Sequence, residues 1–158
     1  MFFSWRTTRR PKILRASEGF GMDQNELLSS AVELGLDLLE KRGSFLPFCK
    51  AVNAAGETFI YTPASASDQG LTEAHASESV RSSVRRELRL RGLVGLAFCR
   101  HTQIRFADSN NAPSIEVQMH YRGQRSAVWH FPYKMEGNTA TVLEYYTNEV
   151  EEDFFSDH

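Results

Sequence analysis

A cysteine and a histidine stand two positions apart in the sequence, at Cys99 and His101. Residues i and i+2 of a strand share one face, so a thiol and an imidazole at this spacing can act as a nucleophile and its base. The residues before Cys99 are apolar, however, and an apolar environment disfavours the reactive thiolate. We therefore predict no catalytic residue here, and we expect Cys99 and the other cysteine, Cys49, to be buried free thiols.

Two further histidines, His120 and His130, fall with Glu116 on the polar face of a predicted hairpin. Imidazole nitrogens and carboxylates bind metal ions and polar small molecules, so this face is a candidate ligand-binding or enzymatic site. The spacing matches no metal-binding signature, and histidines that face solvent or only form hydrogen bonds are the simpler reading. We expect no metal and no cofactor.

Arg81, Arg85 and Arg89 recur every four residues in a segment with helical periodicity. Such a stripe can bind a phosphate backbone or an acidic protein, although arginines on the exposed face of a helix often contact only solvent. The aromatic residues on which single-stranded bases stack are missing between them. Nucleic-acid binding through this helix and the basic N-terminal residues is the second alternative to the function we favour below.

The elements that position these residues follow from the spacing of apolar residues. Helical periodicity runs over about 25–42 and 72–91, and strand-like segments cover about 45–52, 57–62, 93–104, a hairpin within 114–133, and 139–146. This order, α-β-β-α-β-β-β, predicts an α+β fold with two helices and a single five- or six-stranded antiparallel sheet. We expect the helices apart from the sheet or on one face of it, although the apolar run that opens 93–104 predicts a central strand covered on both faces.

Both helices carry recognisable ends. Asp23 and Glu26 form a capping box before the first helix, and Gly43 suits the position after its last turn. Thr72 and Gly92 are the corresponding residues of the second helix.

The hairpin alternates apolar and polar residues on both arms, which gives it one apolar face. A three-residue loop at 123–125 pairs Met119 with Trp129 and places every large apolar side chain on that face. The same register sets His130 opposite Gln118 on the polar face.

Charge divides the chain into three parts. The formal net charge is −2, but residues 1–21 carry five arginines and lysines against one carboxylate, whereas residues 144–158 carry six carboxylates and no arginine or lysine. We predict a basic, disordered N-terminal extension over 1–21, a single domain over 22–146, and an acidic tail over 147–158 that frays. The tail's carboxylates and aromatic rings suit docking on another protein or folding back on the chain's own arginines.

The chain has no stretch of roughly 18 consecutive apolar residues, as a membrane span requires. Its first residues, basic and aromatic, lack the apolar core of a signal peptide. We therefore expect a cytoplasmic protein. Met22, directly before the capping box, is a second candidate for the natural start.

The segment from Gly43 to Phe48 reads Gly-Ser-Phe-Leu-Pro-Phe and follows a leucine-rich helix. It resembles small uncharacterised bacterial α+β proteins in which the same pattern opens the first strand; the resemblance covers about residues 23–135 and implies no activity. The order of elements is also similar to profilin-like and roadblock-type folds, which implies dimerisation and partner binding rather than catalysis.

These observations favour a non-enzymatic, cytoplasmic protein-binding module. The face around Phe45, Pro47 and Phe48, or a free sheet edge, would contact a protein partner or a second copy, and the acidic tail or the arginine helix would select the partner by charge. An immunity or inhibitor protein with a basic partner is one form of this hypothesis. A small-ligand- or metal-binding protein, or an enzyme, that uses the polar face of the sheet is the first alternative.

Overall fold

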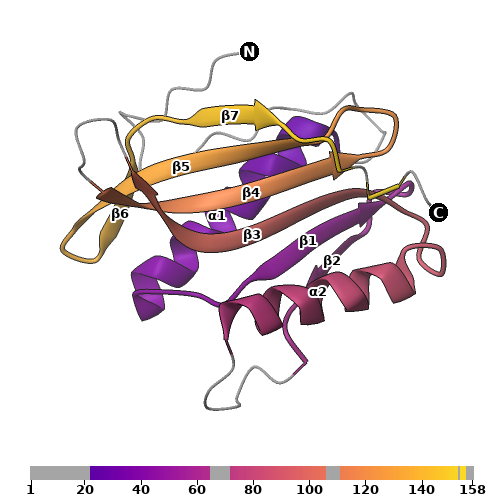
Figure 1. The fold of residues 1–158 in the computed structure, drawn as a ribbon, viewed down its shortest axis with the longest axis horizontal. Helices are drawn as coiled ribbons and strands as arrows, with labels where there is room; N and C mark the ends of the chain where they lie inside the picture. Colours follow the sequence, from indigo (N-terminus) through magenta and orange to yellow (C-terminus); the bar gives the residue numbers. More distant parts are fainter. Residues whose placement is uncertain (1–21, 65–71, 106–110, 153, 156–158) are drawn as a thin grey trace.

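The computed structural model describes residues 22–64, 72–105, 111–152 and 154–155 (Figure 1). The predictions for residues 1–21 lie outside this part of the chain. In chain order the elements are α1 (Gln24–Arg42), β1 (Phe48–Asn53), β2 (Thr58–Tyr61), α2 (Glu73–Glu87), β3 (Leu93–Arg105), β4 (Asn111–Tyr121), β5 (Ala127–Glu136), β6 (Thr139–Val142) and β7 (Tyr146–Glu149). The described residues form the predicted α+β fold, with two helices and one antiparallel sheet of seven strands rather than five or six.

The strands lie in the order β2-β1-β3-β4-β5-β6, and β7 also pairs with β5. The two helices cover opposite faces of this sheet (Figure 1): Phe48 and Val52 of β1 belong to the core beneath α1, whereas Cys49 and Ala51 belong to the core beneath α2. Because successive strand residues point to opposite faces, β1 has two apolar faces, and each needs a cover. The expectation that the helices lie apart from the sheet or on one face is therefore wrong.

The first helix has the predicted ends. The Asp23 side chain accepts a hydrogen bond from the Glu26 backbone N–H (2.8 Å), and Gly43, at φ 79°, donates its N–H to the carbonyl of Leu39 (2.8 Å). A positive φ costs glycine little, so the helix can stop here and turn toward β1.

Replacing the N-cap gives a first testable result. Asp23→Ala is expected to lower the free energy of unfolding by about 1 kcal/mol, because the Glu26 amide loses its acceptor. Urea unfolding measures this loss, and Asp23→Asn, which keeps an acceptor, should remain close to the original chain. An equal loss in both variants would contradict capping as the cause.

The second helix begins as predicted but ends early. Thr72 accepts a hydrogen bond from the backbone N–H of His75 (3.1 Å), whereas the helix stops at Glu87 rather than near residue 91. A turn follows, in which Leu93 donates its N–H to the carbonyl of buried Leu88 (3.0 Å). Tertiary packing of these two leucines thus overrides the helical periodicity.

The hairpin of β4 and β5 is present, but the predicted register is wrong by two residues. Met119 lies opposite Ala127 instead of Trp129. The loop is longer because Arg122 donates its backbone N–H to β3 and the Ser126 hydroxyl bonds a side chain of β4, so neither continues the ladder. A shift of two residues leaves every side chain on its predicted face, and the apolar face packs under α1.

We expected the chain to fray after Tyr146, but the described residues up to Phe155 are ordered against the rest of the fold. Residues Tyr146–Glu149 form β7 along β5, and Phe154 and Phe155 are only 5% and 8% exposed. The contacts that hold these residues belong to the candidate site.

Candidate functional site

Cys99 and His101 do not form a nucleophile–base pair. Burial raises the pKa of the Cys99 thiol well above its usual value. The imidazole Nε2 of His101 lies 2.6 Å from the hydroxyl of Tyr133 instead. Cys49 and Cys99 are both free and buried, as predicted.

His101 makes the stability of the fold depend on pH. Burial lowers its pKa below the usual value of 6.5, so between these two pKa values the unfolded chain binds a proton that the folded chain does not. Its stabilising contribution is therefore complete above about pH 6.5 and is lost as the pH falls toward the folded pKa. We expect His101→Gln to lose less stability than the original chain between neutral and mildly acidic pH, as measured by urea unfolding. Equal losses would contradict this assignment.

The structure separates the two histidines of the polar face. His130 lies opposite Glu116 rather than Gln118, and His120 lies opposite Leu96 of β3. His120 is also fully buried and does not face solvent. Among the described residues, no group of three or more histidine, cysteine, aspartate and glutamate side chains could hold a metal ion.

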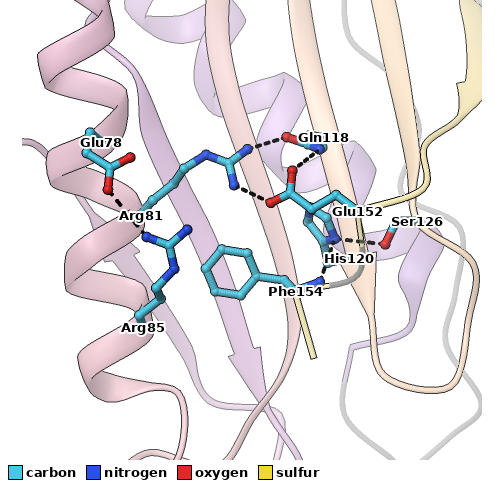
Figure 2. Close-up of polar contacts among 8 residues, drawn as sticks. All are labelled: Glu78, Arg81, Arg85, Gln118, His120, Ser126, Glu152 and Phe154. Carbon is cyan, nitrogen blue, oxygen red and sulfur yellow. Dashed lines mark hydrogen bonds and ion pairs between the residues drawn. The ribbon is translucent and has the colours of Figure 1, made fainter. Parts of the chain in front are cut away.

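Arg81 reaches from α2 across the sheet to the C-terminal segment (Figure 2). Its Nη1 donates to Oε1 of Glu152 (2.8 Å), and its Nη2 donates to the amide oxygen of Gln118 (2.5 Å). The Gln118 amide nitrogen is 3.5 Å from Oε2 of Glu152, so both oxygens of this carboxylate have a donor. The Arg81 guanidinium also makes a cation–π contact, 4.8 Å from the centre of the Phe98 ring.

Phe154 lies beside these contacts of Arg81. Its backbone N–H points to Nδ1 of His120 at 3.5 Å (Figure 2), and its ring centre is 5.2 Å from that of Phe98. The guanidinium of Arg85 is 5.3 Å from the Phe154 ring, and that of Arg122 is 4.8 Å from the next ring, Phe155. We call this region, lined by Arg81, Arg85, Phe98, Gln118 and His120, the arginine groove.

The predicted arginine stripe is therefore divided. Arg81 and Arg85 contact the chain's own C-terminal segment, which is one of the two expectations for the acidic tail, whereas Arg89 lies exposed beyond the end of α2. Sequence reasoning named these arginines but not Glu152 or Phe154 as their partners. The available signal was the pairing of carboxylates with aromatic rings at the end of the chain.

A small cleft of about 280 Å³ adjoins the arginine groove between α2 and the sheet. Arg100 and Glu116 line it, and Nη2 of Arg100 donates to Oε2 of Glu116 (2.8 Å). This bond is the main reason that the pKa of Arg100 is raised. The cation is thus paired with a carboxylate on its neighbouring strand.

A second hollow, of about 320 Å³, lies between the C-terminal part of α1 and the edge strand β2. We call it the edge groove. Mainly apolar residues line it, namely Leu34, Leu38, Arg42, Phe45, Leu46, Pro47, Phe48, Ile60, Thr62 and Pro63.

The edge groove brings together the three residues that the sequence singled out. Phe45 is partly exposed, but Pro47 and Phe48 are buried, and Phe48 belongs to the core beneath α1. The side chains that protrude are Leu46, 41% exposed, and Ile60, 54% exposed. Sequence reasoning missed these two, although the alternation in β2 already set Ile60 apart from its neighbours.

Comparison of the chain with protein-family models, with curated proteins and with solved structures finds no match. In the described part of the chain, neither helix combines the length and the apolar character needed to cross a membrane. The arginine groove and the edge groove are therefore the features of the fold that bear on function.

Proposed function

We propose that this chain is a non-enzymatic protein-binding domain and that its partner at the edge groove is a second copy of itself. The proposal rests on one observation above the others: β2 ends the sheet, and an exposed isoleucine on it borders an apolar hollow. Antiparallel pairing of two β2 strands around a two-fold axis would extend the sheet and cover both hollows.

The composition of β2 supports this pairing. Natural sheet edges are usually blocked by charged residues or proline, yet β2 reads Thr-Phe-Ile-Tyr and contains neither. The opposite side of the sheet, formed by β6 and β7, differs. The backbone N–H of Ala140 in β6 donates to Oε2 of Glu40 in α1 (2.8 Å), and β7 ends in Glu149 with an acidic segment after it. We therefore place the pairing at β2.

The face of β2 opposite Ile60 is also fixed by contacts with α2 and the turn that follows it. The hydroxyl of Tyr61 donates to Oε1 of Glu87 in α2 (3.1 Å), and the guanidinium of Arg91 lies 4.3 Å from the centre of the Phe59 ring. A strand fixed in this way loses little conformational freedom on pairing, which favours association.

Light scattering after size-exclusion chromatography, from low micromolar to submillimolar concentration, tests the proposal. We expect a dimer that dissociates on dilution, and we expect Ile60→Lys to weaken it more than about ten-fold, because lysine blocks edge pairing. Met135→Lys is the matched control: Met135 is 40% exposed, lies on β5 toward the other end of the sheet, and should leave association unchanged. A monomer at every concentration, or equal effects of both lysines, would contradict self-association.

The other hypotheses have less support. Arg81 and Arg85 are engaged by the C-terminal segment rather than open to a nucleic acid, and Arg100 in the small cleft is paired with Glu116. We also propose a reducing compartment, the cytoplasm, because Cys49 and Cys99 are free thiols.

A further inference from the structure

We infer that the arginine groove is a recognition site for an acidic peptide segment of the pattern Glu-x-Phe-Phe, and that the chain's own C-terminal segment occupies it as an internal ligand. A protein that presents the same pattern would compete for the groove. This inference concerns a different face of the sheet and does not depend on pairing through β2.

The groove combines polar groups with the apolar ring of Phe98, and its occupant contributes two buried aromatic rings. Helix α2 packs on β1 and β2, so the neighbouring face of β4 is left to the C-terminal segment. That face presents Gln118 and the buried imidazole of His120. Nδ1 of His120 also lies 2.8 Å from the Ser126 hydroxyl. Buried polar groups cost free energy unless they are hydrogen-bonded, so an occupant that covers this surface must match its donors and acceptors.

The occupant meets this requirement at two points, two residues apart. The carboxylate of Glu152 receives hydrogen bonds from Arg81 and Gln118, and the backbone N–H of Phe154 reaches Nδ1 of His120. The first contact selects a negative charge, because Nη1 of the Arg81 guanidinium donates a charge-assisted hydrogen bond to the carboxylate. The second contact is longer and shares Nδ1 of His120 with Ser126, and it places the main chain of the segment beside β4.

The two rings supply the apolar part of the recognition. Phe154 and Phe155 join the core cluster beneath α2, and the guanidinium groups of Arg85 and Arg122 cover their outer faces. The site thus reads one carboxylate and two consecutive aromatic residues.

The attachment of the internal ligand allows exchange. All four residues of β7 are exposed, and the only partner strand of β7 among the described residues is β5. Between β7 and Glu152, the backbone N–H of Val150 donates to the carbonyl of Ser126 (3.1 Å). A short exposed edge strand opens at small cost, but release of the segment also exposes the rings of Phe154 and Phe155. A competing segment with two aromatic residues refills their place, so that exchange leaves the sheet folded.

A labelled peptide with the sequence of residues 149–158 tests the inference by fluorescence anisotropy. Its binding is measured to the full chain and to the full chain carrying Phe154→Ala and Phe155→Ala, in which the groove is emptied. We expect the emptied chain to bind at least about ten-fold more tightly than the original one, in which the internal segment competes. Arg81→Gln added to the emptied chain should reduce this binding about ten-fold, since a charge-assisted hydrogen bond is lost.

Peptide controls separate recognition from attraction of an acidic peptide to a basic surface. A peptide with Glu152→Gln and one with Phe154→Ala should each bind the emptied chain more weakly, whereas a peptide with a change at exposed Glu151, Glu151→Gln, should bind as well as the original. Absence of binding to a folded, emptied chain, or equal binding of all peptides, would overturn the inference. If the double variant does not fold, Glu152→Gln in the full chain decides: it must bind the peptide more tightly than the original chain, and equal binding overturns the inference.

Discussion

Phe154→Ala is expected to lower the free energy of unfolding by about 3 kcal/mol, although only four residues follow it in the sequence. The ring is 5% exposed and packs against Phe98, His120 and two arginines. Truncation removes these contacts and leaves Arg81 and His120 facing a cavity beside the core. Urea unfolding followed by circular dichroism measures the loss.

Two controls make the result specific. Phe154→Leu retains an apolar side chain and should cost much less, and Tyr146→Ala changes a 39% exposed ring on the same segment and should cost little. A loss below about 0.5 kcal/mol for Phe154→Ala, the range of ordinary surface substitutions, would contradict the packing of the C-terminal segment.

Gly95→Ala is expected to cost about 2–3 kcal/mol, because β3 passes directly beneath a tyrosine ring. A Cβ on Gly95 would lie 2.7 Å from Cδ2 of Tyr121 and 2.9 Å from Cδ2 of Leu27. The tyrosine cannot move freely, since its hydroxyl donates to the carbonyl of Met22 (2.9 Å). Thermal or urea unfolding of this variant measures the strain.

Gly35→Ala in α1 is the matched control. Its Cβ would meet Cδ1 of Ile115 at 3.3 Å, a contact with the end of a flexible side chain. Alanine also gains about 1 kcal/mol of helix propensity over glycine, which offsets the tight contact. We expect Gly35→Ala to stay within about 1 kcal/mol of the original chain. Similar losses at both glycines would contradict the assignment of strain to Tyr121.

Local features could be predicted from the sequence because they are encoded by neighbouring residues. The caps at Asp23 and Thr72 and the stop at Gly43 depend on one side chain and the adjacent backbone, so short patterns reveal them. The order of the elements along the chain and the central position of β3 followed in the same way from apolar spacing.

The errors occurred where distant contacts decide the structure. The hairpin loop is lengthened by bonds from Arg122 to β3 and from Ser126 to His120, which no local pattern encodes. The acidic tail was expected to fray because like charges repel, yet Glu152 finds Arg81, 71 positions away. The placement of the helices had a visible signal, since a central strand with two apolar faces needs a cover on both.

The candidate site shows the same difference between features encoded locally and features set by distant contacts. Phe45 and Pro47, which the sequence singled out, line the edge groove, but the groove also includes Ile60, which comes from another strand. His120 and His130 share a face and yet do not meet, because the register shift places Glu116 beside His130. Residue types were informative about chemistry, and only the three-dimensional register showed which side chains come together.

Hydrogen exchange of the β2 backbone amides at low and high protein concentration tests the central claim most directly. The strand has one edge paired with β1 and one open edge within the described residues. Self-association through β2 predicts that the outward amides among Thr58–Tyr61 become protected as the concentration rises, while those of β7 on the opposite edge do not. Exchange at β2 that is independent of concentration, in a sample that spans the expected dimer range, would contradict the account.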